Sequence, residues 1–229
     1  MAQDARLQAA FPKFAQGISL DEWEYPQEDR AVVCAASLFL RDGIGNVKMT
    51  DIAREANVGV ATLYRHFSTK SRLAIAAGTL MWRRINAGIH DLVESGEFLR
   101  LNGLSRLEAL LAEYCEVYVA HPTFVRFLDE FDHLVLAEGV QKSELEEYGR
   151  EVDSFYLIFD DAYLLGRQDG SIKRVIEFNS YYHAVAHALM GVAEKFTRGE
   201  IIPSDDFSAG EKELRCIVQM AVLALGTEN

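Results

Sequence analysis

Residues 48–70, KMTDIAREANVGVATLYRHFSTK, restrict the fold more than any other part of this sequence. Two short helical segments, 50–56 and 60–67, are separated by only three residues, so they must cross at a steep angle. Ala53 is small enough to let the two helices approach, and Asn57 tolerates the left-handed backbone that so short a turn requires. The pattern predicts a helix-turn-helix. The apolar positions expected to join its helices to the preceding one are Ile52, Ala56, Val58, Leu63 and Phe67.

The charge of the chain is distributed unevenly around this motif. The whole sequence has a formal net charge of −12, but residues 30–84 hold nine basic and three acidic groups, a net +6. Residues 1–29 carry a net −4 and residues 85–229 a net −14. A cationic segment inside an anionic chain is typical of a nucleic-acid-binding module joined to another domain. A helical surface that is basic for no such reason is the alternative.

The sequence around the motif predicts an all-α protein, because it has four prolines and little strand-like alternation. We expect an N-terminal extension over 1–27, a DNA-binding domain over 28–84 and a further helical domain over 85–229. Thr50 is the expected N-cap of the first motif helix, and Ser68 that of the long helix that follows. The further expected helices cover about 69–93, 105–120, 122–137, 142–166, 172–198 and 208–225.

Several classes of protein find no support in this sequence. No apolar run approaches the roughly 18–20 residues that cross a bilayer, and the N-terminus lacks a signal-peptide pattern. Cys34, Cys115 and Cys216 are odd in number and lie in apolar stretches, which favours reduced thiols and a cytoplasmic protein. No catalytic motif is present, so we expect no enzymatic activity and no cofactor.

Residues 28–84 resemble the DNA-binding domain of the TetR (TetR/AcrR) family of transcriptional regulators. The resemblance implies a three-helix reading head, which includes a helix-turn-helix over 48–67, followed by a helical body. It also implies a homodimer whose two-fold axis would set the reading helices one DNA turn, roughly 34–36 Å, apart. The matching residues are Leu38-Phe39, Asp42-Gly43, TDIAREA (Thr50 to Ala56), TLYRHF (Thr62 to Phe67) and Lys70.

The resemblance also implies the residues that contact DNA. Phosphate contacts are expected from Thr50, Tyr64, His66 and Lys70, and base contacts from Val60, Ala61, Thr62 and Arg65. Lys48 and Gly59 complete the expected interface. Two features depart from the family: Gly59-Val60 replaces a frequent Ser-Lys, and the N-terminal extension is acidic, so it is not expected to act as a basic arm in the minor groove.

In the family, the helical body forms the dimer and encloses a ligand, so the resemblance implies that residues 85–229 are a ligand-binding and dimerisation domain. The aromatic residues expected to line a site for an apolar or aromatic effector are Trp82, Tyr114, Tyr118, Phe127, Phe131, Phe155, Phe159 and Tyr163. For any one of them, plain core packing is the alternative. The expected dimer contacts are Tyr181, Val185, Leu189, Val192 and Met220.

His183 and His187 have the i, i+4 spacing of a zinc-binding pair, but no third ligand is evident, so packing or interface contacts are favoured and no metal is expected.

The motif and the resemblance together predict a cytoplasmic homodimeric repressor that binds a near-palindromic operator and is released by a small molecule. Two alternatives stay open. One is a DNA-bound structural or adaptor protein of the same fold without an inducer, and the other is a ligand-sequestering or enzymatic module with a vestigial reading head.

Overall fold

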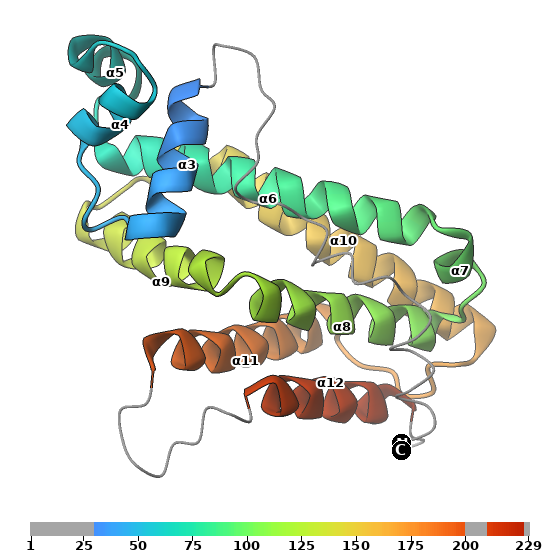
Figure 1. Ribbon diagram of the computed structural model, residues 1–229. Helices are drawn as coiled ribbons and strands as arrows, with labels where there is room; N and C mark the ends of the chain where they lie inside the picture. Colours follow the sequence, from blue (N-terminus) through green and yellow to red (C-terminus); the bar gives the residue numbers. More distant parts are fainter. Residues whose placement is uncertain (1–29, 200–209, 227–229) are drawn as a thin grey trace. The chain divides into compact units, whose positions relative to one another are not determined.

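The computed structural model describes residues 30–199 and 210–226 (Figure 1). All regular structure in these two ranges is helical, and they contain no strand, which confirms the predicted all-α class. The N-terminal extension expected over 1–27 lies outside the described residues.

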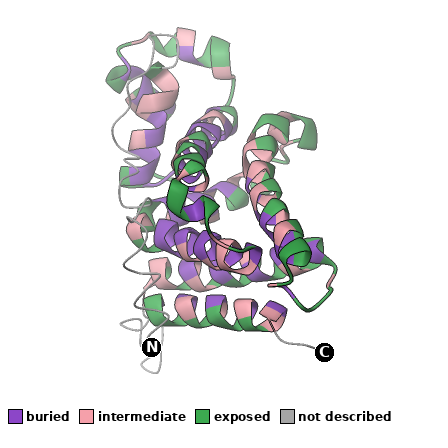
Figure 2. Ribbon diagram, turned by 90° about the vertical axis from the view of Figure 1, so that its right-hand side faces the viewer, coloured by how far each residue is buried: buried purple, intermediate pink, exposed green. Residues whose placement is uncertain are grey.

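The helices follow one another with short connections. They are α3 (Arg30–Asp42), α4 (Met49–Glu55), α5 (Val60–Phe67), α6 (Lys70–Glu94), α7 (Gly96–Leu99), α8 (Gly103–Ala120), α9 (Pro122–Ala137), the 3₁₀ helix η2 (Lys142–Leu145), α10 (Glu146–Asp169), α11 (Phe178–Arg198) and α12 (Gly210–Gly226). Most are amphipathic: buried and exposed residues alternate along them at helical spacing (Figure 2).

The described chain forms two compact units, each with its own core. The unit that holds the helix-turn-helix, which we call the reading unit, comprises residues 30–86 and 123–153. The other, which we call the body unit, comprises residues 87–122, 154–199 and 210–226. The boundary falls inside α6 and α10 and at the junction of α8 and α9.

A row of aromatic rings forms the core of the reading unit. Phe127 of α9 stacks on Phe39 of α3 with ring centroids 6.3 Å apart, and on Phe131 at 5.7 Å. Phe131 in turn stacks on Tyr148 of α10 at 4.7 Å. Trp82 of α6 meets Phe124 edge to face at 5.2 Å and donates its indole N–H to the Tyr148 hydroxyl at 3.1 Å. The rings therefore fix α3 and α6, which flank the helix-turn-helix, to α9 and the start of α10.

In the body unit, α12 packs on α8 and α11, and α11 and α12 lie side by side (Figure 1). Leu189, Leu214 and Leu225 fill this contact and are each at most 2% exposed. The Arg215 guanidinium on α12 binds the carboxylate of Glu116 on α8 at 2.6 Å, where Glu116 is almost fully buried. Because a buried charge is costly unless it is paired, this ion pair fixes how α12 lies on α8.

Four local features differ from the sequence expectation. Residues 172–177 are not helical: the amides of Lys173 and Arg174 donate to the Leu225 carbonyl at the end of α12 instead. The one-turn helix α7 was not predicted.

The starts of two helices also differ. Helix α4 begins at Met49, one residue before the expected cap Thr50, because the Asp51 carboxylate accepts a hydrogen bond from the Lys48 amide at 3.2 Å. Thr69, not Ser68, caps α6 by accepting from the Arg72 amide.

Within residues 30–199 and 210–226, no helix combines the length and the apolarity that a membrane span requires.

The crossing of α8 and α10 depends on two glycines. A Cβ atom on Gly103 would lie 2.0 Å from the Gly166 nitrogen and 2.2 Å from its Cα, both backbone atoms that cannot rotate away. We therefore expect Gly103→Ala to destabilise the body unit by about 2–3 kcal/mol, measured as a lower urea midpoint. Gly149→Ala is the matched control, because nothing lies within 4 Å of its Cβ position in α10. It should stabilise by about 0.5–1 kcal/mol. Equal effects of the two substitutions would contradict this packing.

Candidate nucleic-acid interface

The turn between α4 and α5 sets the angle between these helices. The Val58 amide donates to the Ala53 carbonyl at 2.9 Å and the Asn57 amide to the Arg54 carbonyl at 3.1 Å. This pair of bonds is a Schellman motif, which requires a left-handed residue between them. Asn57 has a φ of 54°, as its sequence position predicted. Ala53 and Leu63 are buried where α4 and α5 pack, so the predicted helix-turn-helix is present.

Helix α5 presents one solvated face. Five residues on it are exposed, with Val60 and Tyr64 at 40% and 48%. Gly59, at the N-cap, makes no side-chain cap hydrogen bond, as expected for a glycine at this position. The face carries small side chains at its start and a phenol, a guanidinium and an imidazole further on, a size and chemistry that suit the major groove. Its exposed members are Val60, Ala61, Tyr64, Arg65 and His66, and Thr62 is half-buried at its edge.

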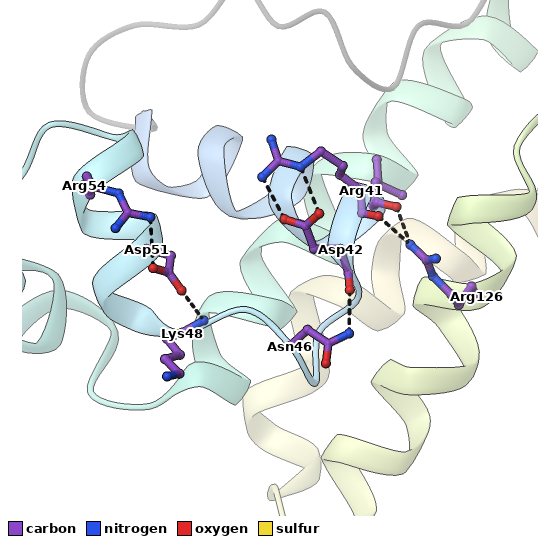
Figure 3. A network of polar contacts seen from close by, with 8 residues as sticks. Arg41, Asp42, Asn46, Lys48, Asp51, Arg54 and Arg126 are labelled. Carbon is purple, nitrogen blue, oxygen red and sulfur yellow. Dashed lines mark hydrogen bonds and ion pairs between the residues drawn. The ribbon is translucent and has the colours of Figure 1, made fainter.

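The start of α4 borders this face. Lys48 and Thr50 are exposed there, in positions where side chains and backbone amides at a helix N-terminus can meet a phosphate. Asp51 accepts hydrogen bonds from the Lys48 amide at 3.2 Å and from Arg54 at 3.0 Å (Figure 3). The Asp51 carboxylate therefore orients this helix end and holds the Arg54 side chain beside it.

Lys70 has a structural role that its sequence position did not reveal. Its ammonium donates to the Ile44 carbonyl at 2.8 Å and to the Val47 carbonyl at 3.3 Å, in the loop between α3 and α4. Lys70 is half-buried and is the first residue of α6, separated by two residues from the end of α5, the helix expected to read DNA. It thus ties the first turn of α6 to the loop that leads into α4. A phosphate contact by Lys70 stays a prediction.

Two further residues that sequence analysis missed hold the same loop from α9. Arg126 donates to the carbonyls of Leu40 at 2.5 Å and Arg41 at 3.3 Å, at the end of α3 (Figure 3). One turn later, the Glu130 carboxylate accepts from the amides of Ile44 and Gly45. Arg126 therefore satisfies carbonyls that a helix end leaves unpaired, and Glu130 satisfies the loop amides beyond them. From sequence alone, this i, i+4 pair looks like an ordinary surface ion pair.

The positive charge of the reading unit is partly neutralised. Arg41 pairs with Asp42 at 2.7 Å, and this guanidinium lowers the pKa of the Asp42 carboxyl. Arg72 binds Glu144 at 2.7 Å, and Arg83 binds Glu151 at 2.8 Å and Glu147. These three glutamates lie outside the basic segment 30–84, so its net +6 overstates the local field. The basic groups on the exposed face of α5 are Arg65 and His66.

The expected effector residues divide between the two units. Trp82, Phe127 and Phe131 lie in the core of the reading unit described above. The other five lie in the body unit, where Tyr114 packs against Tyr118, Phe155 and Phe159 at 5.0, 5.9 and 6.5 Å between ring centroids. All eight are buried in contacts with other rings or apolar side chains: Trp82, Tyr114, Tyr118, Phe127, Phe131, Phe155, Phe159 and Tyr163.

The expected dimer residues do not share one exposed face. Leu189 is fully buried and Val185 is 9% exposed inside the protomer, because α12 and α8 cover that side of α11. Tyr181 is half-buried and donates its hydroxyl to the Ala221 carbonyl at 2.8 Å. Val192 is half-buried, and Met220 on α12 is 58% exposed. The exposed side of α11 is formed instead by His183, Ala184, His187, Ala188 and Gly191.

The helix-turn-helix has relatives of known family. Residues 33–77 match the model of the family described as "Bacterial regulatory proteins, tetR family". HTH-type transcriptional regulators of Staphylococcus aureus strains USA300 and N315 are 49% identical over 39 residues. That match spans 17% of this chain and 21% of the length of each relative.

Solved structures share the fold over most of the chain. The fatty acid degradation regulator FadR from Bacillus halodurans superposes with a TM-score of 0.62 at 16% identity, covering 88% of this chain and 97% of that one. A transcriptional regulator from Saccharomonospora viridis in complex with choline gives a TM-score of 0.58 at 19% identity, covering 83% and 94%. The helix-turn-helix and the helical body therefore have the architecture of these regulators.

The hydrogen bonds of Lys70 make a prediction about stability. Lys70→Met keeps the length of the side chain but leaves two loop carbonyls without their charged donor, so we expect a loss of about 1–3 kcal/mol in urea unfolding. A lysine that only contacts phosphate would leave stability unchanged, and its loss would reduce the salt dependence of DNA binding by about one unit of slope. An unchanged free energy of unfolding would contradict the role of Lys70 in holding this loop.

Proposed function

We propose that this chain is a homodimeric transcriptional repressor that binds a near-palindromic DNA operator and is released by a small molecule. Its helix-turn-helix matches the tetR family of bacterial regulatory proteins. The observation that carries the proposal is the exposed face of α5, where Val60, Tyr64, Arg65 and His66 are turned to solvent, next to a loop that Lys70 fixes to the start of α6. A reading helix needs both an open face and a fixed orientation.

Each exposed group on this face has a partner in a DNA duplex. The Tyr64 hydroxyl and the His66 ring are suited to phosphate oxygens, and Arg65 can pair with the O6 and N7 atoms of guanine. Val60 and Ala61 are small and apolar, which suits contact with a thymine methyl group. Lys48 and Thr50 would contact the DNA backbone beside the groove. The hydrogen bonds of Arg126 and Glu130 to the end of α3 and the loop after it would keep α4 and α5 oriented toward that groove.

A homodimer is supported by apolar side chains left uncovered in the body unit. Met220 and Leu223 on α12 are 58% and 64% exposed, and the outer side of α11 carries Ala184 and Ala188. Burying such groups against a second copy would remove apolar surface from water. A homodimer would carry two α5 helices, and a near-palindromic operator offers them two half-sites on successive turns of the same face of DNA.

The effector site is proposed in the body unit, within the aromatic cluster of Tyr114, Tyr118, Phe155 and Phe159. Burial raises the pKa of the Tyr118 hydroxyl, and the neighbouring Tyr114 hydroxyl raises it further, but no described residue makes a hydrogen bond of ordinary geometry to the Tyr118 hydroxyl. A ligand with an apolar or aromatic skeleton and one polar atom would satisfy it. A fatty-acid regulator and a choline complex among the structural relatives support a small organic effector without identifying it.

Release would be a shift between two populated states. Helix α6 begins at Lys70, separated by two residues from the end of α5, and continues to Glu94 in the body unit. An effector that binds more tightly to a conformation with α6 in a different orientation would shift the protein toward that conformation. The two reading helices would then move out of operator spacing. A differential affinity of a few kcal/mol between the states suffices for a large change in occupancy.

DNA binding is tested with a duplex selected from a random pool by the wild-type chain. Tyr64→Ala should weaken binding to that duplex by about tenfold to a hundredfold, because each protomer loses a phosphate contact. The matched control is Leu136→Ala, which truncates a residue that is 80% exposed on α9 of the same unit and should bind like wild type. Anisotropy titrations at several salt concentrations measure both. Failure of the wild type to enrich any sequence would refute the proposal.

The effector site has its own test. Tyr118→Phe removes a hydroxyl that makes no hydrogen bond of ordinary geometry with the described residues, so we expect unfolding stability within about 0.5 kcal/mol of wild type. Effector-induced release from DNA should nevertheless require at least tenfold more ligand. The panel comprises long-chain fatty acyl compounds, choline and planar aromatic compounds, read out by thermal shift and loss of DNA binding. If no compound class stabilises the protein or releases DNA, the adaptor alternative without an inducer is favoured.

A further inference from the structure

Two histidines on the outer side of α11 form a pair that the proposed function does not use. His183 and His187 are both exposed, and their rings stack with centroids 5.8 Å apart and an interplanar angle of 27°. Tyr156 of α10 flanks the pair, its ring parallel to that of His183 at 6.3 Å. The i, i+4 spacing on a helix lets two imidazoles turn toward one cation.

The surroundings of this pair permit a second helix to approach closely. Ala184, Ala188 and Gly191 are exposed on the same side of α11, and nothing lies within 4 Å of a Cβ position at Gly191. Small side chains at such spacing let two helix backbones come together. His187 and Ala188 stand at the middle of the 21-residue helix, so a two-fold crossing at the midpoint of α11 would bring both histidine pairs to the axis.

One protomer alone supplies too few ligands for a closed site. Within residues 30–199 and 210–226, no group of three or more His, Cys, Asp or Glu side chains is placed to hold a metal ion. Two copies related by a two-fold axis would supply four imidazole nitrogens. That number completes the tetrahedral shell of Zn²⁺, a cation that neutral imidazole binds well.

We propose that His183 and His187 of two protomers together bind one Zn²⁺ ion at the dimer axis. The inference rests on the homodimer of the proposed function and departs from the sequence expectation of no metal. Because each protomer contributes half of the ligands, the ion would link the two copies of α11. It would thereby tighten the dimer without touching either DNA or the aromatic cluster of the body unit.

Calorimetric titration of the full chain with Zn²⁺, after removal of metals with EDTA and desalting, tests the site. We expect one Zn²⁺ for every two chains. His183→Ala and His187→Ala should each weaken this binding by at least tenfold, because each removes two of the four ligands. His90→Ala changes an exposed histidine on α6 and is the matched control, expected to bind Zn²⁺ like wild type. Replacement by Co²⁺ should give the intense visible absorption of a tetrahedral site in wild type and in His90→Ala only.

The oligomeric state separates failure of this inference from failure of the proposed function. Light scattering in EDTA measures the dimer without metal. A dimer that binds no Zn²⁺, or that binds it equally well in the His183→Ala variant, overturns the metal site and leaves the proposed regulator standing. One Zn²⁺ bound per chain by a monomer also overturns the shared site. A chain that stays monomeric both in EDTA and with Zn²⁺ overturns the homodimer itself.

Discussion

The end of α3 and the loop behind it are held by charged side chains that come from two other helices. Arg126 of α9 satisfies the last carbonyls of α3, Glu130 satisfies the loop amides, and Lys70 of α6 satisfies the loop carbonyls. A free helix end and a bare loop would leave these groups unpaired or solvated, and the packing of α4 on α3 and α5 would then be the main constraint on its direction. The orientation of the reading helix depends on this arrangement, because α5 follows α4 across the turn at Asn57 and leads through Ser68 and Thr69 into Lys70 at the start of α6.

The same contacts link α3 and the loop after it to the positions of α9 and α6. Phe127, between Arg126 and Glu130 on α9, stacks on Phe39 of α3, so the polar contacts and the aromatic core act on one helix from one side. A shift of α9 or α6 would therefore move α3 and the loop together, since packed rings slide poorly past one another. Coupling of an effector to DNA affinity needs such an element, with contacts that differ between two states.

The sequence predicted the features that local rules determine. Asn57 in a left-handed turn, Ala53 at the helix contact and the helix Pro122–Ala137 follow from backbone preferences and periodicity, and the structure has them. Features that depend on distant partners could not be predicted. Glu130 looks like a surface residue until the loop amides lie beside it, and residues 172–177 read as helix although their amides bind the end of α12. The sequence also could not predict which side of α11 is exposed, because Val185 and Leu189 are apolar whether they face α12 or a partner.

In the proposed homodimer, two α5 helices read one face of DNA as a symmetric pair held at a fixed spacing. Hydroxyl-radical footprinting of the wild-type chain on its selected duplex measures that spacing directly. We expect two protected patches on each strand, related by a dyad, with the two half-site centres one helical turn apart, about 10–10.5 base pairs. Added effector should remove both patches together. A single asymmetric patch, or protection without a dyad, would contradict the paired reading helices.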